Sequence, residues 1–193
     1  MNPDESARWK NEALDVVFAA LASSRTLTGR IVFKGARVLS RRLRQVHRQS
    51  LDIDMNLSAA FVSQFPARED QRRALETDID TTLRRYIEAQ SVVRYEIRAV
   101  SIKPKPQGDH PRGWNAFEAR IGLMDRSNPN ALALPSLVLD IAAPESLGPH
   151  AVAPLDVDGH PVAAYTLERI VGEKLRAFLS SLPAHRRKLG RVA

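Results

Sequence analysis

The stretch KGARVLSRRLRQVHRQSLDIDMNLS, residues Lys34–Ser58, decides the fold. It follows a short apolar run at 30–33, and Gly35 ends that run, which predicts a strand that stops at a glycine. Apolar residues then recur at helical spacing from Ala36, and polar residues fill the opposite face. We expect the arginines of this helix to lie on its exposed side: Arg37, Arg41 and Arg44. The stretch therefore predicts a strand, a glycine exit, a basic helix and a second strand.

The second strand, LDIDMNL at 51–57, alternates strictly between apolar and polar residues. Asp52 and Asp54 therefore point to the same face, because successive side chains of a strand alternate. Two carboxylates this close repel each other unless water or a cation screens them. A solvated strand face is one interpretation. The other is a metal site, since Mg²⁺ is held by one or two carboxylates together with substrate phosphates.

Two neighbouring features favour the metal site. Gly35 permits close approach of the backbone to a ligand, and the start of the helix after it offers free N–H groups suited to phosphate. Asp140 is the only charged residue of LPSLVLDIAAP at 134–144, and a lone carboxylate in such a strand is costly to bury without a partner. Glu96, in the strand-like segment 92–102, competes with Asp140 as the third acid. Cations held by such acids support phosphoryl transfer.

The rest of the chain predicts further helices and strands around this unit. Helices are expected at 6–23, 67–90 and 166–182, the last with Thr166 as its N-cap, and strands at 92–102, 114–124 and 134–144. The proline- and glycine-rich segments predict a loop at 103–113, and at 144–164 a connector with a short hairpin around DVDGHPV. The order of elements predicts an α+β fold, a mixed β-sheet core flanked by helices, in one domain. Its expected parts are an N-terminal helical segment at 1–29, a core at 30–143, and the connector with the last helix at 144–193.

Composition excludes several classes of protein. The chain has 193 residues, 44% of them hydrophobic and 26% charged, which is typical of a globular protein. It has no cysteine, so disulfides and thiolate metal sites are excluded, and this suits a reducing cytoplasm. The polar start lacks a signal peptide and no apolar run reaches the roughly 18 residues of a membrane span, so we expect a cytoplasmic protein with no membrane contact. The net charge of +7 favours an anionic partner such as nucleic acid or a nucleotide, although a solvated helix face and a basic tail give the same sum.

These motifs resemble the nucleotidyltransferase fold of the DNA polymerase β superfamily, and more closely the AbiEii/AbiGii toxin family. That family carries K-G-G-T-A-L followed by R-x-S-x-D-I-D-L, to which KGARVL at 34–39 and RQSLDIDM at 48–55 are similar. A later strand of the family carries an acid, like Asp140 here. A helix of the form E-E-I-L-A-E-K-L-x-A-L follows, like ERIVGEKLRAF at 168–178. The resemblance covers residues 31–182, most of the chain.

The resemblance implies a metal-dependent nucleotidyltransferase that transfers NMP from an NTP to an acceptor hydroxyl, like the toxin of a type IV toxin–antitoxin or phage-defence system. It implies Mg²⁺ or Mn²⁺ as the cofactor, held by the catalytic residues Asp52, Asp54 and Asp140, or Asp140 as a general base. The nucleotide-binding residues that it implies are Lys34, Gly35, Ala36, Arg48, Ser50 and Lys174. The partners that it implies are an NTP, an RNA or tRNA acceptor, and a cognate antitoxin.

Two departures from the family pattern leave alternatives open. The second glycine and the threonine of the glycine motif are Ala36 and Arg37 here, so the nucleotide cradle is altered and Arg37 becomes a candidate phosphate contact. The R-D-x-Y-D-L segment and further helices of the family do not follow, which predicts a truncated C-terminal helical part. A degenerate, non-catalytic member that binds nucleic acid or a partner is therefore the alternative, and a generic basic α+β scaffold is the third.

Lys174 has an unusual position on the last predicted helix. A helical wheel places it within an apolar stripe formed by Leu167, Ile170, Val171 and Phe178, where a lysine is unexpected. Either its stem packs in the stripe while its ammonium reaches solvent, or the ammonium faces the carboxylates or a triphosphate. The first interpretation treats the stripe as a packed face of the helix.

Overall fold

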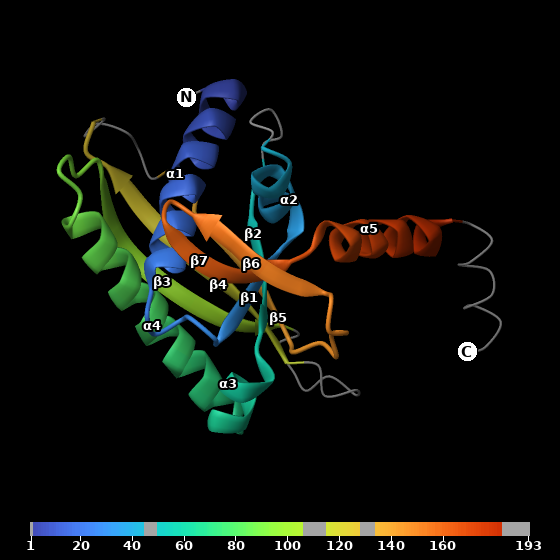
Figure 1. The fold of residues 1–193 in the computed structure, drawn as a ribbon. Helices are drawn as coiled ribbons and strands as arrows, with labels where there is room; N and C mark the ends of the chain where they lie inside the picture. The colour runs from blue at the N-terminus through green and yellow to red at the C-terminus, as the bar shows by residue number, and fades with distance from the viewer. Residues whose placement is uncertain (1, 45–49, 106–114, 128–133, 183–193) are drawn as a thin grey trace.

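The computed structural model describes residues 2–44, 50–105, 115–127 and 134–182 (Figure 1). The helices are α1 (Pro3–Ser23), α2 (Gly35–Leu43), α3 (Ala59–Gln64), α4 (Arg68–Glu88) and α5 (Leu167–Ser181). The strands are β1 (Ile31–Lys34), β2 (Ile53–Leu57), β3 (Tyr95–Lys105), β4 (Ala116–Asp125), β5 (Leu137–Ala142), β6 (Val152–Val157) and β7 (His160–Tyr165). No helix within these ranges is long and apolar enough to cross a membrane.

One mixed sheet organises the fold, with its seven strands in the order β3-β4-β5-β2-β1-β7-β6. β2 pairs with β5, and β1 with β7, in parallel, whereas the other neighbours are antiparallel. The predicted α+β class, a mixed sheet flanked by helices, is therefore confirmed. β2 and β5, the strands of the candidate acids, are neighbours near the centre of the sheet.

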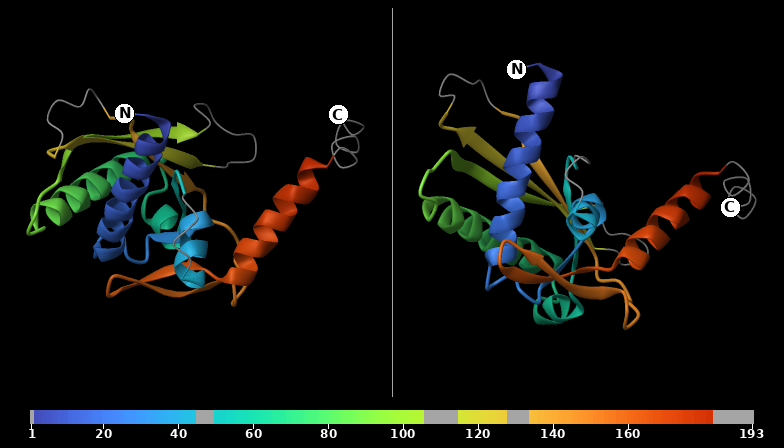
Figure 2. Two further views of the ribbon diagram at one scale, coloured as in Figure 1. Left: turned by 90° about the horizontal axis from the view of Figure 1, so that it is seen from above. Right: turned by 45° about the horizontal axis from the view of Figure 1, so that its top comes forward.

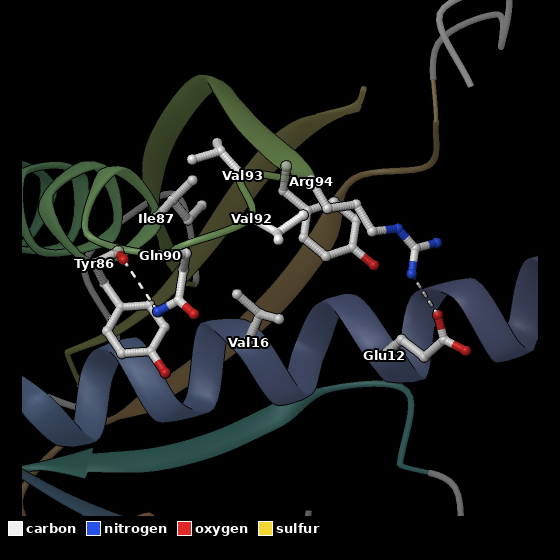
Figure 3. A pocket seen from close by; sticks show the side chains of 9 residues that line it. Glu12, Val16, Tyr86, Ile87, Gln90, Val92, Val93 and Arg94 are labelled. Atoms are coloured by element: carbon white, nitrogen blue, oxygen red, sulfur yellow. Dashed lines mark hydrogen bonds and ion pairs between the residues drawn. The ribbon is translucent and has the colours of Figure 1, made fainter. Parts of the chain in front are cut away.

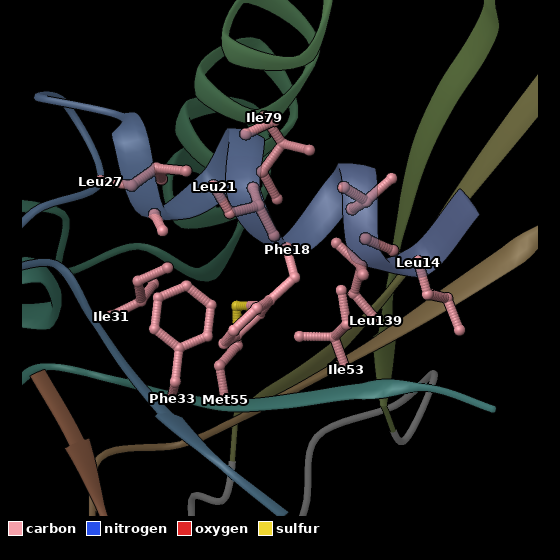
Figure 4. Packing of buried hydrophobic residues seen from close by; sticks show 14 of the residues in the cluster. Leu14, Phe18, Leu21, Leu27, Ile31, Phe33, Ile53, Met55, Ile79 and Leu139 are labelled. Atoms are coloured by element: carbon pink, nitrogen blue, oxygen red, sulfur yellow. The ribbon is translucent and has the colours of Figure 1, made fainter. Parts of the chain in front are cut away.

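Helices α1 and α4 lie side by side across one face of the sheet and cover its apolar core (Figures 1 and 2). Phe18 of α1 meets Phe33 of β1 edge to face, with ring centroids 4.9 Å apart (Figure 4). Ile53 and Met55 of β2 are buried in the same cluster. Because side chains alternate along β2, burial of these two residues turns Asp54 to the opposite face of the sheet.

The segment after β5 contains the predicted hairpin around DVDGHPV, but the hairpin is longer than expected. β6 and β7 pair along their whole length, and β7 joins the sheet beside β1. The turn between them has Asp158 and Gly159 at φ of 52° and 86°, as a two-residue type I′ hairpin requires. Pro154 and Pro161 conceal the alternation in the sequence, and Pro154 lies on β6, an edge strand where proline is tolerated.

Two helix starts were not predicted correctly by periodicity. α1 begins at Pro3 rather than at residue 6, behind a capping box in which Asn2 and Glu5 exchange hydrogen bonds. α3 lies in a segment for which no element was predicted. Its N-cap is Ser58, whose hydroxyl accepts the N–H of the buried Phe61 (3.2 Å). Six residues are too few for a helical pattern to be recognised.

α5 follows its predicted N-cap, since the Thr166 hydroxyl accepts the N–H of Arg169 (3.3 Å). The helix then projects from the rest of the molecule (Figures 1 and 2). Ile170 is buried, but Val171 and Phe178 are 59% and 61% exposed. The prediction of a packed apolar stripe is therefore wrong beyond the first turn. An amphipathic pattern marks a helix face that is suited to burial. The described part of the chain covers this apolar face of α5 only near the start of the helix, at Ile170.

Candidate active site

Three aspartates come together on β2 and β5. Asp54 lies beside Asp140 in the parallel register of these strands, and Asp52 comes immediately before β2. One oxygen of each carboxylate lies within 4.8 Å of the others, and all three side chains are half-buried. The sheet thus joins a pair of acids close in sequence to a third from a distant strand.

Glu96, the competing third acid, lies elsewhere. It is on β3, which β4 and β5 separate from β2. Its carboxylate binds the guanidinium of Arg126 at 3.0 Å. Asp140 rather than Glu96 therefore stands beside the D-x-D pair. Asp140 and Glu96 differ in their distance from the D-x-D pair because β5 lies next to β2 and β3 does not. The sequence pattern of a single strand does not predict the order of strands in the sheet.

Gly35 brings the start of α2 against these acids. Its φ is +77°, and a Cβ at this position would lie 2.0 Å from Asp54 Oδ2. Glycine is required on both grounds, because other residues are strained in this conformation and a side chain would overlap the carboxylate. The first turn of α2, with the N–H of Ala36, therefore presents the positive end of a helix near Asp54. Arg48, another candidate of the same motif, lies outside the described residues.

The pKa of Asp54 reflects the crowding of the site. Burial raises the pKa of this carboxyl above its ordinary value of 3.8, and the charges of Asp52 and Asp140 act in the same direction. The ammonium groups of Lys34 and Lys174 lower it. The two lysines therefore lie close enough to act on the charge of the acids. The remaining repulsion is of the kind that a divalent cation relieves.

The two predicted lysines lie on different elements, β1 and α5. Lys34, at the end of β1, has its ammonium 3.6 Å from Glu145 and 5.9 Å from the centroid of the Tyr165 ring. Lys174 is exposed on α5. Val171 and Phe178 of the same stripe are exposed as well, so the first interpretation of Lys174 lacks the buried stripe that it assumed.

Lys105 is a candidate site residue that the sequence patterns did not predict. From the end of β3 its ammonium binds Asp140 Oδ1 at 2.8 Å and Glu118 Oε2 at 2.6 Å. Glu118 is the neighbour of Asp140 on β4 and also accepts a hydrogen bond from Arg120 (2.6 Å). The prolines around Lys105 predict a loop, whereas β3 continues to this residue. The pairing of β3, β4 and β5 brings Lys105 to Asp140, and no local sequence motif indicates this contact.

Ser50 contacts Asp52 directly, and Arg37 contacts Ser50. The Ser50 hydroxyl donates to Asp52 Oδ1 and to the Asp52 carbonyl oxygen, both at 3.0 Å. Arg37 was predicted to be exposed, but it is 6% exposed and binds Asp15 and Asn11 of α1. The prediction is wrong because α1 lies against the first turn of α2. The terminal nitrogens of Arg37 are engaged within the protein rather than presented to a phosphate.

The donor set fits a divalent cation. Three carboxylates offer only oxygen ligands, which suit Mg²⁺ or Mn²⁺. The chain has no thiol that would favour a softer metal. A cation there would lie next to the N-terminus of α2, where phosphate oxygens are also favoured. The arrangement is therefore chemically suited to phosphoryl or nucleotidyl transfer.

A pocket on the helical side of the sheet is separate from the acids (Figure 3). It has a volume of about 350 Å³ and lies between α1, the end of α4 and the start of β3. Val16 and Val92 are among its apolar residues, and Arg94 binds Glu12 at 3.0 Å across its rim. The candidate site residues do not line it.

Comparison with known proteins identifies the family. The sequence model described as nucleotidyl transferase AbiEii toxin, type IV toxin–antitoxin system, matches residues 17–191, and the chain belongs to this family. Among solved structures, the antibiotic-resistance factor ANT(2'')-Ia is similar over 90% of this chain and 76% of its own, at 12% identity and a TM-score of 0.44. No curated protein matches the sequence.

Proposed function

We propose that this protein transfers a nucleoside monophosphate from an NTP to an acceptor hydroxyl, with Mg²⁺ or Mn²⁺ as cofactor. The observation that carries the proposal is the convergence of Asp52, Asp54 and Asp140 beside the start of α2, where Gly35 leaves room for the carboxylate. Membership of a nucleotidyltransferase family supports it.

The acids have distinct roles in this reaction. Asp52 and Asp54 hold the cation, and Asp140 completes the site or accepts the proton of the acceptor hydroxyl. When bound, the cation stabilises charge on the attacking and leaving oxygens. The acceptor oxygen forms a bond to the α-phosphorus, the bond from this phosphorus to the bridging oxygen breaks, and pyrophosphate leaves with the electron pair.

The nucleotide is bound by the elements next to the acids. The first turn of α2, with Gly35 and Ala36, directs N–H groups to the phosphates. Lys34 and Lys174 offset the charge of the triphosphate, as ammonium groups do in charge-assisted hydrogen bonds. Ser50 supports Asp52, and Arg48 is proposed as a neighbour of the nucleotide from its motif alone.

RNA is the acceptor class that we favour, with tRNA as the first candidate. The net charge of +7 favours a polyanionic partner, and RNA offers terminal hydroxyl groups. The cytoplasm, where NTPs and RNA are both present, is the compartment in which such a reaction would occur. A cognate antitoxin is the protein partner that the family description suggests.

Incubation of the protein with each α-labelled NTP, Mg²⁺ and total cellular RNA tests the function. We expect label in one RNA fraction with one preferred NTP, and none after chelation of the metal. Asp54→Asn should give no label. Arg176→Met, which changes an exposed residue of α5, is the matched control and should label as the wild type does.

Two outcomes would contradict parts of the proposal. Label on protein or on a small molecule would replace RNA as the acceptor. If no NTP gives label although the protein binds nucleotide and RNA, the chain would be the degenerate, non-catalytic member of the family.

A further inference from the structure

Arg37 is buried close to the acidic site although it carries a full charge. Its Nη1 binds Asp15 of α1, and its Nη2 donates to Asn11 Oδ1 (3.1 Å) and to the Ser50 carbonyl oxygen (3.0 Å). A buried arginine needs such partners, because an unpaired charge in the interior is costly. The guanidinium therefore ties α1 to the segment that leads into β2.

Ser50 continues this network to Asp52. Ser50 is also 6% exposed, and its hydroxyl donates to Asp52 Oδ1 and to the Asp52 carbonyl. Burial lowers the pKa of Arg37, while the charges of Asp15 and Asp52 oppose this shift. A connected path thus runs from α1 through Arg37 and Ser50 to a carboxylate of the site.

Asp52 needs this support more than Asp54 does. Asp54 lies within β2, where both neighbouring strands pair with it. The pairing of β2 with β5 begins at Ile53, so Asp52 lies just outside it. Its carboxylate is therefore oriented by contacts other than the strand ladder, and the described contacts of this kind come from Ser50.

We propose that Arg37 is a positioning residue, which holds the Ser50 backbone so that the Ser50 hydroxyl fixes the Asp52 carboxylate for cation binding. The inference rests on the proposed function, since it assumes that Asp52 is a cation ligand. The Arg37 side chain spans from α2 to Asp15 of α1. Arg37 acts on the site through Ser50, and its terminal nitrogens bind protein groups rather than phosphate.

Binding of Mn²⁺ to the full chain without nucleotide, followed by electron paramagnetic resonance, tests this role apart from turnover. Ser50→Ala and Arg37→Gln should each weaken Mn²⁺ binding by about tenfold, as is usual when the partner that orients a metal ligand is lost. The double variant should lose less than the product of the two single losses, because both residues act on one path.

Asp15→Asn is the matched control. It removes the ion pair of Arg37 on the α1 side but leaves the hydrogen bond to the Ser50 carbonyl. We expect a lower melting temperature with nearly unchanged Mn²⁺ affinity. This separates the loss of general stability from the loss of a positioned Asp52.

The outcomes distinguish this inference from the function on which it rests. Wild-type binding together with unchanged affinity in folded Ser50→Ala or Arg37→Gln overturns the inference alone, and so do multiplicative losses in the double variant. Absence of Mn²⁺ binding by the wild type overturns both. If Arg37→Gln does not fold, Arg37→Lys replaces it. Lysine keeps the charge but has a single nitrogen, so a lysine paired with Asp15 leaves the Ser50 carbonyl without its donor, and unchanged affinity in that variant also overturns the inference.

Discussion

The Asp54 carboxylate occupies the space that a side chain on Gly35 would need, since a Cβ there would lie 2.0 Å from Oδ2. The antiparallel register of β1 and β2 sets Lys34 opposite Asp54, so the turn into α2 falls directly beside the acid. The backbone freedom of one residue thus determines where the carboxylate of another can lie.

Gly35→Ala is expected to damage the site through this contact. The new methyl group must displace the Asp54 side chain, and alanine is strained at φ of +77°. We expect Mn²⁺ affinity to fall about tenfold or more, as when the orientation of a ligand is lost. Metal titration of the purified variant measures this effect.

Gly159→Ala provides the matched control for that substitution. Gly159 has φ of +86°, but a Cβ there meets nothing within 4 Å. Its cost is therefore the backbone strain alone, about 1–2 kcal/mol of unfolding free energy. Equal Mn²⁺ affinity in the Gly35→Ala and Gly159→Ala variants would show that contact with Asp54 is unimportant.

Asp54→Asn should abolish cation binding and stabilise the metal-free protein. The substitution removes a charge that burial and Asp52 both disfavour. Relief on the order of 1 kcal/mol would raise the melting temperature by about 2–4 °C. Thermal unfolding with and without Mg²⁺ checks both effects, because only the wild type should gain stability from the ion. A variant that fails to fold would make Asp54 a structural residue.

The pH dependence of stability follows from the same shift. The folded pKa of Asp54 is raised above 3.8, so this group binds more protons when folded than when unfolded. Its contribution to stability is present at low pH and is lost as pH rises from 3.8 through the raised pKa. The wild type should therefore lose stability relative to Asp54→Asn across this window, with a constant gap above it. Denaturant unfolding of both proteins at several pH values measures the gap, and a gap that narrows with rising pH would contradict the shift.

Lys174→Met tests the lysine on α5. The side chain is exposed, so its loss should leave the free energy of unfolding within about 0.5 kcal/mol of the wild type. Loss of its positive charge should weaken NTP binding at least about tenfold, or 1.4 kcal/mol. Arg176→Met removes a charge from the same exposed helix and should have little effect. If a nucleotide titration gives equal affinities for the two variants, Lys174 does not bind the nucleotide.

The exposed face of α5 gives a prediction about stability. Phe178 is 61% exposed, so Phe178→Ser should change the free energy of unfolding by no more than about 0.5 kcal/mol. Ile170 is 1% exposed, and Ile170→Ala should cost about 2–5 kcal/mol. Chemical denaturation compares the two variants. A large loss in Phe178→Ser would mean that this face is covered in solution.

Local patterns predicted those parts of the site that depend on one element. Alternation in LDIDMNL is enough to place Asp52 and Asp54 on one face, and the lone charge of its strand singles out Asp140. The mixed sheet follows from the order of helices and strands. The role of Asp52, Asp54 and Asp140 as cation ligands stays a prediction, which a metal titration tests.

The errors arise where the environment of a residue comes from distant elements. A helical wheel predicts that Arg37 is exposed, because a wheel describes one helix only. The partners that bury Arg37 lie on another helix, α1. Lys105 reaches Asp140 only through the pairing of β3, β4 and β5. The stripe on α5 has the correct amphipathic spacing, but spacing does not supply the surface that would cover it.

The parallel pairing of β1 with β7, with Phe33 beside Ala164, has a consequence for the order of assembly during translation. A nascent chain that has reached the end of β5 already contains Gly35 and all three acids. Tyr165, against which Lys34 lies, and Lys174 are still to be synthesised. The emerging polypeptide would therefore contain Lys34 and all three acids before Lys174, which is proposed to offset the charge of the triphosphate, has been made.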